Sequence, residues 1–230
     1  MMSSRFKIAV ATIAGLVILS ASGAEARGPR PAGPVRVDLS ASAHPIGAGN
    51  RYADTAHRVN TVRGVTTHAA TTATASAICR GCSAEAISVQ VLYLDRSPTM
   101  RLDNVAIAWT QGCASCNATA VSLQVVVVSR PGSLITANRA AALNAACNAC
   151  HATSGAFQLV VSGKAQSRFS ATTLRSLTSW ASTQALLLRT PDLLGLSHLQ
   201  QRLALKRLAH LVNADLGTRT LGARARVSGQ

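Results

Sequence analysis

A pair of cysteines separated by two residues occurs three times in this chain at a constant interval. The three motifs begin 34 residues apart and use all six cysteines: Cys79 and Cys82, Cys113 and Cys116, Cys147 and Cys150. A glutamine lies 11 residues after the first cysteine of each copy, at Gln90, Gln124 and Gln158. Cysteines and glutamines that coincide at one period indicate a threefold structural repeat.

The segments on either side of each motif predict β-strands. Residues 87–94, 121–128 and 157–161 are short, apolar and rich in β-branched side chains, and a turn-forming sequence closes each of them. The preceding arm is ambiguous, since residues 104–109 alternate small and large side chains whereas residues 138–146 are rich in alanine, a strong helix former. We expect strands in both arms because their asparagine and alanine positions keep a period of two. A mostly helical arrangement stays open as the alternative.

The motif then lies at a bend between antiparallel strands, and the copies form one sheet or a short solenoid. In such an array the three glutamines stack as an amide ladder or lie on the surface. The fold class that we expect is therefore α+β, with an antiparallel β-rich repeat region over residues 68–163.

The N-terminus has the pattern of a secretory signal peptide. Arg5 and Lys7 precede an apolar stretch over residues 8–19, and Ala24-Glu25-Ala26 is a small-residue cleavage site. We expect cleavage after Ala26 and a location outside the cytoplasm, either secreted or in the cell envelope. Residues 27–67, which begin rich in proline, glycine and arginine, are expected to form a disordered linker.

The C-terminal part predicts a basic helical hairpin over residues 164–217, with Ser170 as a helix cap and Gly217 as a stop. The tail, residues 218–230, is expected to be disordered. Residues 164–230 hold ten Lys and Arg side chains against Asp192 and Asp215, so much of the net charge of +15 belongs to this flank.

That charge favours contact with an anionic envelope polymer, an acidic lipid surface or another protein. The side chains expected at such a surface are Arg202, Lys206 and Arg207. Specific nucleic-acid binding is not expected, because aromatic side chains make up only 3% of the chain. The sequence does not indicate an oligomeric state.

Four chemistries fit the cysteines. Structural disulfides are favoured, since the cysteines of an exported protein usually pair when their number is even. Which cysteines pair with each other stays open. A thiol–disulfide oxidoreductase, a zinc site and a c-type haem are the alternatives, the last because His151 completes a C-x-x-C-H pattern with Cys147 and Cys150. The disulfide interpretation requires no cofactor.

Catalytic motifs are missing from the sequence. It contains no G-x-S-x-G, H-E-x-x-H or phosphate-binding glycine pattern, and its acidic residues are few and dispersed. We therefore expect an exported, non-catalytic structural or interaction protein. Its CxxC pairs would act as disulfide staples, and its basic flank would contact an anionic partner.

Overall fold

The computed structural model describes residues 33–190 and 197–229. The expected signal peptide, residues 1–26, lies outside these ranges. Within these ranges the chain passes through eight strands, two helices and a final strand. They are β1 (Val35–Ala43), β2 (Arg51–Arg63), β3 (Thr67–Ala77), β4 (Ser83–Asp95), β5 (Thr99–Gln111), β6 (Asn117–Ser129), β7 (Ser133–Ala145), β8 (His151–Ser162), α1 (Ala171–Arg189), α2 (His198–Leu216) and β9 (Arg219–Gly229).

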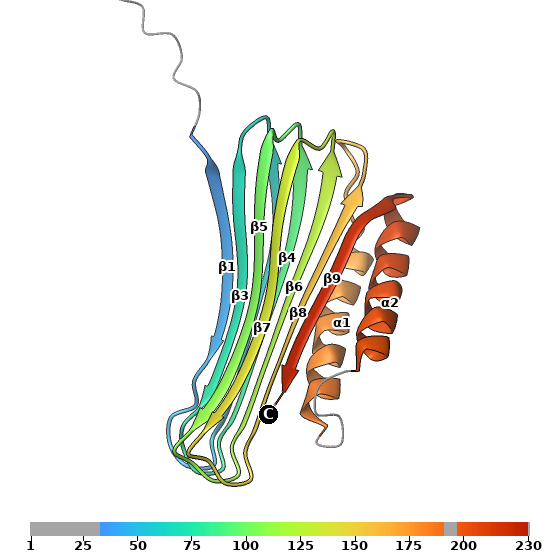
Figure 1. The fold of residues 1–230 in the computed structure, drawn as a ribbon. Helices are drawn as coiled ribbons and strands as arrows, with labels where there is room; N and C mark the ends of the chain where they lie inside the picture. Colours follow the sequence, from blue (N-terminus) through green and yellow to red (C-terminus); the bar gives the residue numbers. More distant parts are fainter. Residues whose placement is uncertain (1–32, 191–196, 230) are drawn as a thin grey trace, which may run out of the picture. The chain divides into compact units, whose positions relative to one another are not determined.

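The strands form two sheets in the manner of a solenoid (Figure 1). Sheet A has the order β1-β3-β5-β7, and sheet B has the order β2-β4-β6-β8-β9. Successive strands alternate between the sheets, so each coil of the solenoid contributes one strand to each. Equivalent positions of the second, third and fourth coils lie 33 or 34 residues apart, as in the pairs Thr67 with Met100 and Ser83 with Asn117.

The expectation of antiparallel repeat strands was wrong. All neighbouring strands within sheet A are parallel, as are β2, β4, β6 and β8 in sheet B. The reason is that each CxxC bend carries the chain to the opposite sheet instead of folding it back as a hairpin. Neighbours in one sheet therefore come from successive copies and run in the same direction.

The alanine-rich arms are strands, so the mostly helical alternative is also wrong. β7 contains Ala140, Ala141 and Ala142, and it pairs with β5 along its whole length. Between the sheets, alanines fill the end of the solenoid next to the cysteines, including Ala106, Ala108, Ala118 and Ala120. Packing of these small side chains between two sheets overrides the helix propensity of alanine.

The interior has three layers along the strand direction. Alanine and cysteine occupy the end near the CxxC bends, and Val and Leu side chains such as Leu92, Leu102 and Val126 occupy the opposite end. Glutamine, asparagine and serine lie between them, and Gln124 is fully buried. On the outer face of sheet B, α1 and α2 cover a separate apolar core that includes Leu123, Phe157 and Leu177.

The prediction of a disordered linker over residues 27–67 was wrong for its described part. β1 and β2 form a first coil that stacks on β3 and β4. Because Arg51 pairs with Ser83, Gly47 and Asn50 occupy the places of Cys79 and Cys82. Asn50 N–H donates to Gly47 O as Cys82 N–H donates to Cys79 O, so this bend keeps its backbone pattern without sulfur.

The predicted helices are present. Ser170 caps α1 by accepting from Thr173 N, and α2 ends at Gly217, which has a left-handed φ of 59°. Arg189 in the last turn of α1 pairs with Glu85 on β4, and the apolar side chains of α1, among them Leu177, pack on sheet B. Among the described residues, no helix is both long and apolar enough to cross a membrane.

The prediction of a disordered tail over residues 218–230 was also wrong for its described part, residues 218–229. β9 pairs antiparallel with β8 and covers the edge of sheet B (Figure 1). The pairing has a register shift between Val160 and Val161. Ser228 Oγ accepts from Ala142 N on β7, and Arg224 donates to Thr136 O of the same strand. The tail thus closes the C-terminal end of the solenoid.

Candidate functional site: the cysteine column and the basic cap

The three CxxC motifs form a column at one end of the solenoid. Each motif lies at the bend between a strand of sheet A and a strand of sheet B, and its two sulfurs are within disulfide-bonding distance. Gly81 N–H donates to Ala114 O and Ser115 N–H to Asn148 O, both at 2.9 Å. These bonds hold successive bends in register, so the cysteine pairs stack.

Backbone conformation within the bends is constrained. The residue before the second cysteine has a left-handed φ in each motif: 67° at Gly81, 54° at Ser115 and 50° at Ala149. Only glycine adopts this conformation without a steric cost from its Cβ. The second and third CxxC motifs, which have Ser115 and Ala149 at this position, therefore hold an unfavourable backbone geometry. The flanking strands and the cysteine pairs impose it.

Sulfurs of neighbouring copies also approach each other. Cys113 Sγ lies 3.3 Å from Cys147 Sγ and 3.8 Å from Cys150 Sγ. The four sulfurs of Cys113, Cys116, Cys147 and Cys150 all lie within 4.8 Å of one another. The column therefore contains both cysteine pairs at disulfide distance and a four-sulfur cluster of the kind that can hold a metal ion.

The haem and oxidoreductase alternatives stay predictions. His151 begins β8 and is in register with Asn117, which in turn aligns with Ser83. Two thioether bonds to haem would use both sulfurs of the third motif, which here lie within bonding distance of each other. A reactive CxxC cysteine often lies at a helix N-terminus, which lowers its pKa, whereas these motifs lie between strands.

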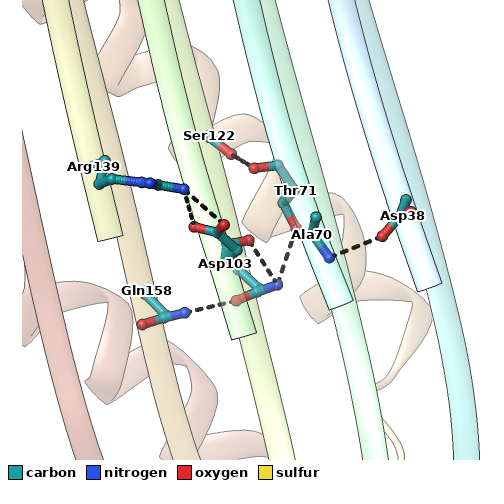
Figure 2. A network of polar contacts seen from close by, with 8 residues as sticks. Asp38, Ala70, Thr71, Asp103, Ser122, Arg139 and Gln158 are labelled. Atoms are coloured by element: carbon teal, nitrogen blue, oxygen red, sulfur yellow. Dashed lines mark hydrogen bonds and ion pairs between the residues drawn. The ribbon is translucent and has the colours of Figure 1, made fainter. Parts of the chain in front are cut away.

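A buried polar network crosses the middle layer of the solenoid (Figure 2). Gln158 Nε2 donates to Gln124 Oε1 at 2.7 Å, Gln124 Nε2 donates to Gln90 Oε1 at 2.9 Å, and Gln90 Nε2 donates to Val37 O at 2.9 Å. The three glutamines thus form the amide ladder expected from the repeat. A second amide contact joins neighbouring coils, because Asn104 Nδ2 donates to Asn138 Oδ1 at 2.7 Å. The network holds the coils in one register.

An arginine meets each end of the glutamine ladder. Arg58 on β2 is in register with Gln90, and Arg224 on β9 is in register with Gln158. Arg58 donates to Asp38 O at 3.1 Å, whereas Gln158 Oε1 is buried without a hydrogen-bond partner among the described residues. At this row of sheet B, the first coil and the added strand β9 therefore carry arginine where the second, third and fourth coils carry glutamine.

A basic groove lies at the C-terminal end of the solenoid. It has a volume of 710 Å³ and is lined by side chains of β7, α2 and β9, among them Arg202, Arg224 and Arg226. Among the described residues, no Asp or Glu lines it. Within the described ranges, neither Arg202 nor Arg226 takes part in an ion pair. Three guanidinium groups therefore share one concave surface, to which the described part of the chain contributes no carboxylate; we call this groove with its three arginines the basic cap.

The groove includes only one of the three basic residues predicted from the sequence. Arg202 lines it, whereas Lys206 and Arg207 are exposed on α2 and lie outside the lining. Arg224 and Arg226 were missed, because the tail was expected to be disordered. Their alternation with Ala223 and Ala225, which is the period of a strand, was the available signal.

Comparison with known proteins gives no match: no family model, no curated protein and no solved structure aligns with the chain. The function must therefore be argued from the groove and the cysteine column themselves.

Proposed function

We propose that this chain is an exported, non-catalytic structural and interaction protein. Its CxxC pairs act as disulfide staples that hold the bends of the solenoid, and its basic cap binds an anionic component of the cell envelope. We infer export from the N-terminal signal pattern. N-terminal sequencing of the secreted protein should then find Arg27 as its first residue.

The convergence of Arg202, Arg224 and Arg226 in a groove whose described lining contains no carboxylate is the observation that carries this proposal. Like charges on one concave surface repel one another and raise the local concentration of anions. Guanidinium groups bind carboxylate and phosphate oxygens through paired hydrogen bonds. A polymer with repeated acidic groups would satisfy several of these arginines at once.

Arginine on an edge strand also has a purely structural use. Charged side chains on β9 discourage a further strand from pairing with that edge. This use accounts for Arg224 and Arg226, but it does not require Arg202 of α2 to line the same groove. The two roles are compatible, and a binding experiment separates them.

The experiment uses polyglutamate and polyphosphate as probes on the full mature chain. The cap variant carries Arg202→Gln, Arg224→Gln and Arg226→Gln. The matched control carries Arg36→Gln, Arg63→Gln and Arg101→Gln, which removes the same charge from three exposed arginines elsewhere. Three exposed charge contacts at ~0.5 kcal/mol each predict a roughly tenfold loss of affinity for the cap variant.

The control variant is expected to lose much less affinity than the cap variant, and binding of the unmodified chain should weaken as salt is raised. Equal losses in the two variants would show that net charge alone drives the contact, and the groove would then not be a site. An absence of binding at low salt would refute the interaction role altogether.

A further inference from the structure

We propose that Cys113, Cys116, Cys147 and Cys150 form a tetrathiolate site for one Zn²⁺ ion when their two disulfides are reduced. The third and fourth coils stack on each other, and this stacking brings their two CxxC pairs into one four-sulfur cluster. This proposal is independent of the basic groove.

The spacing of the sulfurs between coils suits a tetrahedral site. A zinc ion bonded to four sulfurs at ~2.3 Å requires sulfurs that are ~3.8 Å apart. Cys113 Sγ lies 3.3 Å from Cys147 Sγ and 3.8 Å from Cys150 Sγ, and all four sulfurs fall within 4.8 Å. The backbone bonds between the bends therefore already provide the separation that the metal requires.

Within each motif the two disulfide-bonded sulfurs lie closer together than a zinc site requires. They therefore have to move apart once the disulfide is reduced. The Cα atoms of Cys113 and Cys116 are 6.3 Å apart, and those of Cys147 and Cys150 are 5.9 Å apart. Side-chain rotation can open each pair without displacing the strands, and C-x₂-C is a spacing found in structural zinc sites. Cys116 is fully buried and the other three are partly buried, so the ion would be shielded from solvent.

One ion per chain follows from the composition of the column. The first coil has Gly47 and Asn50 in place of a cysteine pair, so it offers no thiolate to Cys79 and Cys82. The sulfurs of Cys79 and Cys82 lie outside the four-sulfur group. They contact Pro45 O at 3.5 Å and Gly47 O at 3.1 Å instead.

The redox step balances with an external dithiol as reductant. Each of the two disulfides takes up two electrons and two protons from one dithiol, which is itself oxidised to a cyclic disulfide. Zn²⁺ then displaces the four thiol protons and bonds to four thiolates. Disulfides and metal exclude each other. The disulfides link residues within one coil, whereas the ion links the third coil to the fourth.

The experiment adds Co²⁺ and then Zn²⁺ to the full mature chain reduced with a dithiol under anaerobic conditions. We expect the visible absorption of a tetrahedral cobalt–thiolate site, its loss when Zn²⁺ displaces Co²⁺, and one metal per chain by elemental analysis. The variant Cys147→Ser/Cys150→Ser should lose this spectrum. The matched variant Cys79→Ser/Cys82→Ser should keep it.

Circular dichroism accounts for the chance that reduction alone unfolds the chain. If the reduced, metal-free chain is unfolded, Zn²⁺ should restore the β-sheet signal, in the matched variant as well. A reduced chain that gives no thiolate spectrum, whether it stays folded or fails to refold with the metal, overturns the proposal. Equal loss of the spectrum in both variants overturns it too.

Discussion

The sharpest test of the solenoid interior is a comparison of two substitutions in the glutamine ladder. Gln124 is the middle glutamine: it is fully buried, it donates to Gln90 Oε1 and Thr71 Oγ1, and it accepts from Gln158 Nε2. Gln158 is the last one, and its own Oε1 has no partner in the described part of the chain.

The Gln124→Ala substitution leaves Gln158 Nε2 buried without an acceptor, which costs ~1–3 kcal/mol. The cavity left by the deleted side chain adds ~1–2 kcal/mol, for a total of ~2–5 kcal/mol. Gln90 Oε1 retains the hydrogen bond from Thr71 Oγ1 at 2.6 Å, so it adds no further penalty.

The Gln158→Ala substitution removes one donor from Gln124 Oε1 but also removes a buried oxygen that lacks a partner. These two effects offset each other, and the cavity left by the buried side chain adds ~1–2 kcal/mol as it does at Gln124, so we expect a net loss of ~1–2 kcal/mol. Both variants should be unfolded by urea with their disulfides intact. Their free energies of unfolding can be compared directly if these depend on urea concentration with the same slope. If Gln158→Ala is as costly as Gln124→Ala, the ladder is not the source of the stability assigned to it.

Two further substitutions and one pH titration test local features. Ala149→Gly should stabilise the third bend by ~1 kcal/mol in a urea titration, because φ at this position is 50°; a loss of stability would contradict the backbone argument. Arg58→Gln would give the first coil the glutamine of the other coils, so we expect end-to-end association in light scattering at high concentration; a monomer at every concentration would show that Arg58 does not block stacking. Burial raises the pKa of Tyr93 despite the hydrogen bond from Phe169 N–H. The neutral phenol is thus favoured in the folded state, and its contribution to stability should be complete below pH ~10 and be lost as pH rises through the folded pKa. Absorbance titration of a Tyr52→Phe variant measures this directly, and a folded-state pKa at or below the ordinary value would refute it.

The repeat was predictable because its markers are rare residues at fixed spacing. Cysteine and glutamine positions located the second, third and fourth coils and the ladder between them. The first coil escaped notice because Gly47 and Asn50 replace its cysteines and Arg58 replaces its glutamine. Its strands are also more polar and more exposed, since one side of each faces no further coil. A coil at the end of an array carries a weaker sequence pattern for this physical reason.

Strand direction could not be read from the same pattern. Two strands joined by a short bend are equally consistent with a hairpin and with two sheets of a solenoid. The deciding factor is the interior, where Ala, Gln and Val layers of successive copies match in register only when the copies stack in parallel. The helices were predictable because their signals are local: Ser170 at a start and Gly217 at a stop.

The candidate site was only partly predictable. All six cysteines were identified, but the four-sulfur cluster depends on which copies lie side by side, which is a tertiary property. The basic groove likewise joins Arg202 to Arg224 and Arg226 across a helix and a strand that the sequence did not place together. Charge composition identified the flank but not the groove.

The most direct test of the central claim is the sulfur connectivity of the natively secreted protein. Its free thiols are blocked before any reduction, the chain is digested, and the linked peptides are identified by mass spectrometry. We predict no blocked thiol and three disulfides, each within one motif: Cys79–Cys82, Cys113–Cys116 and Cys147–Cys150. Free thiols in a folded protein, or disulfides that join different motifs, would contradict the account.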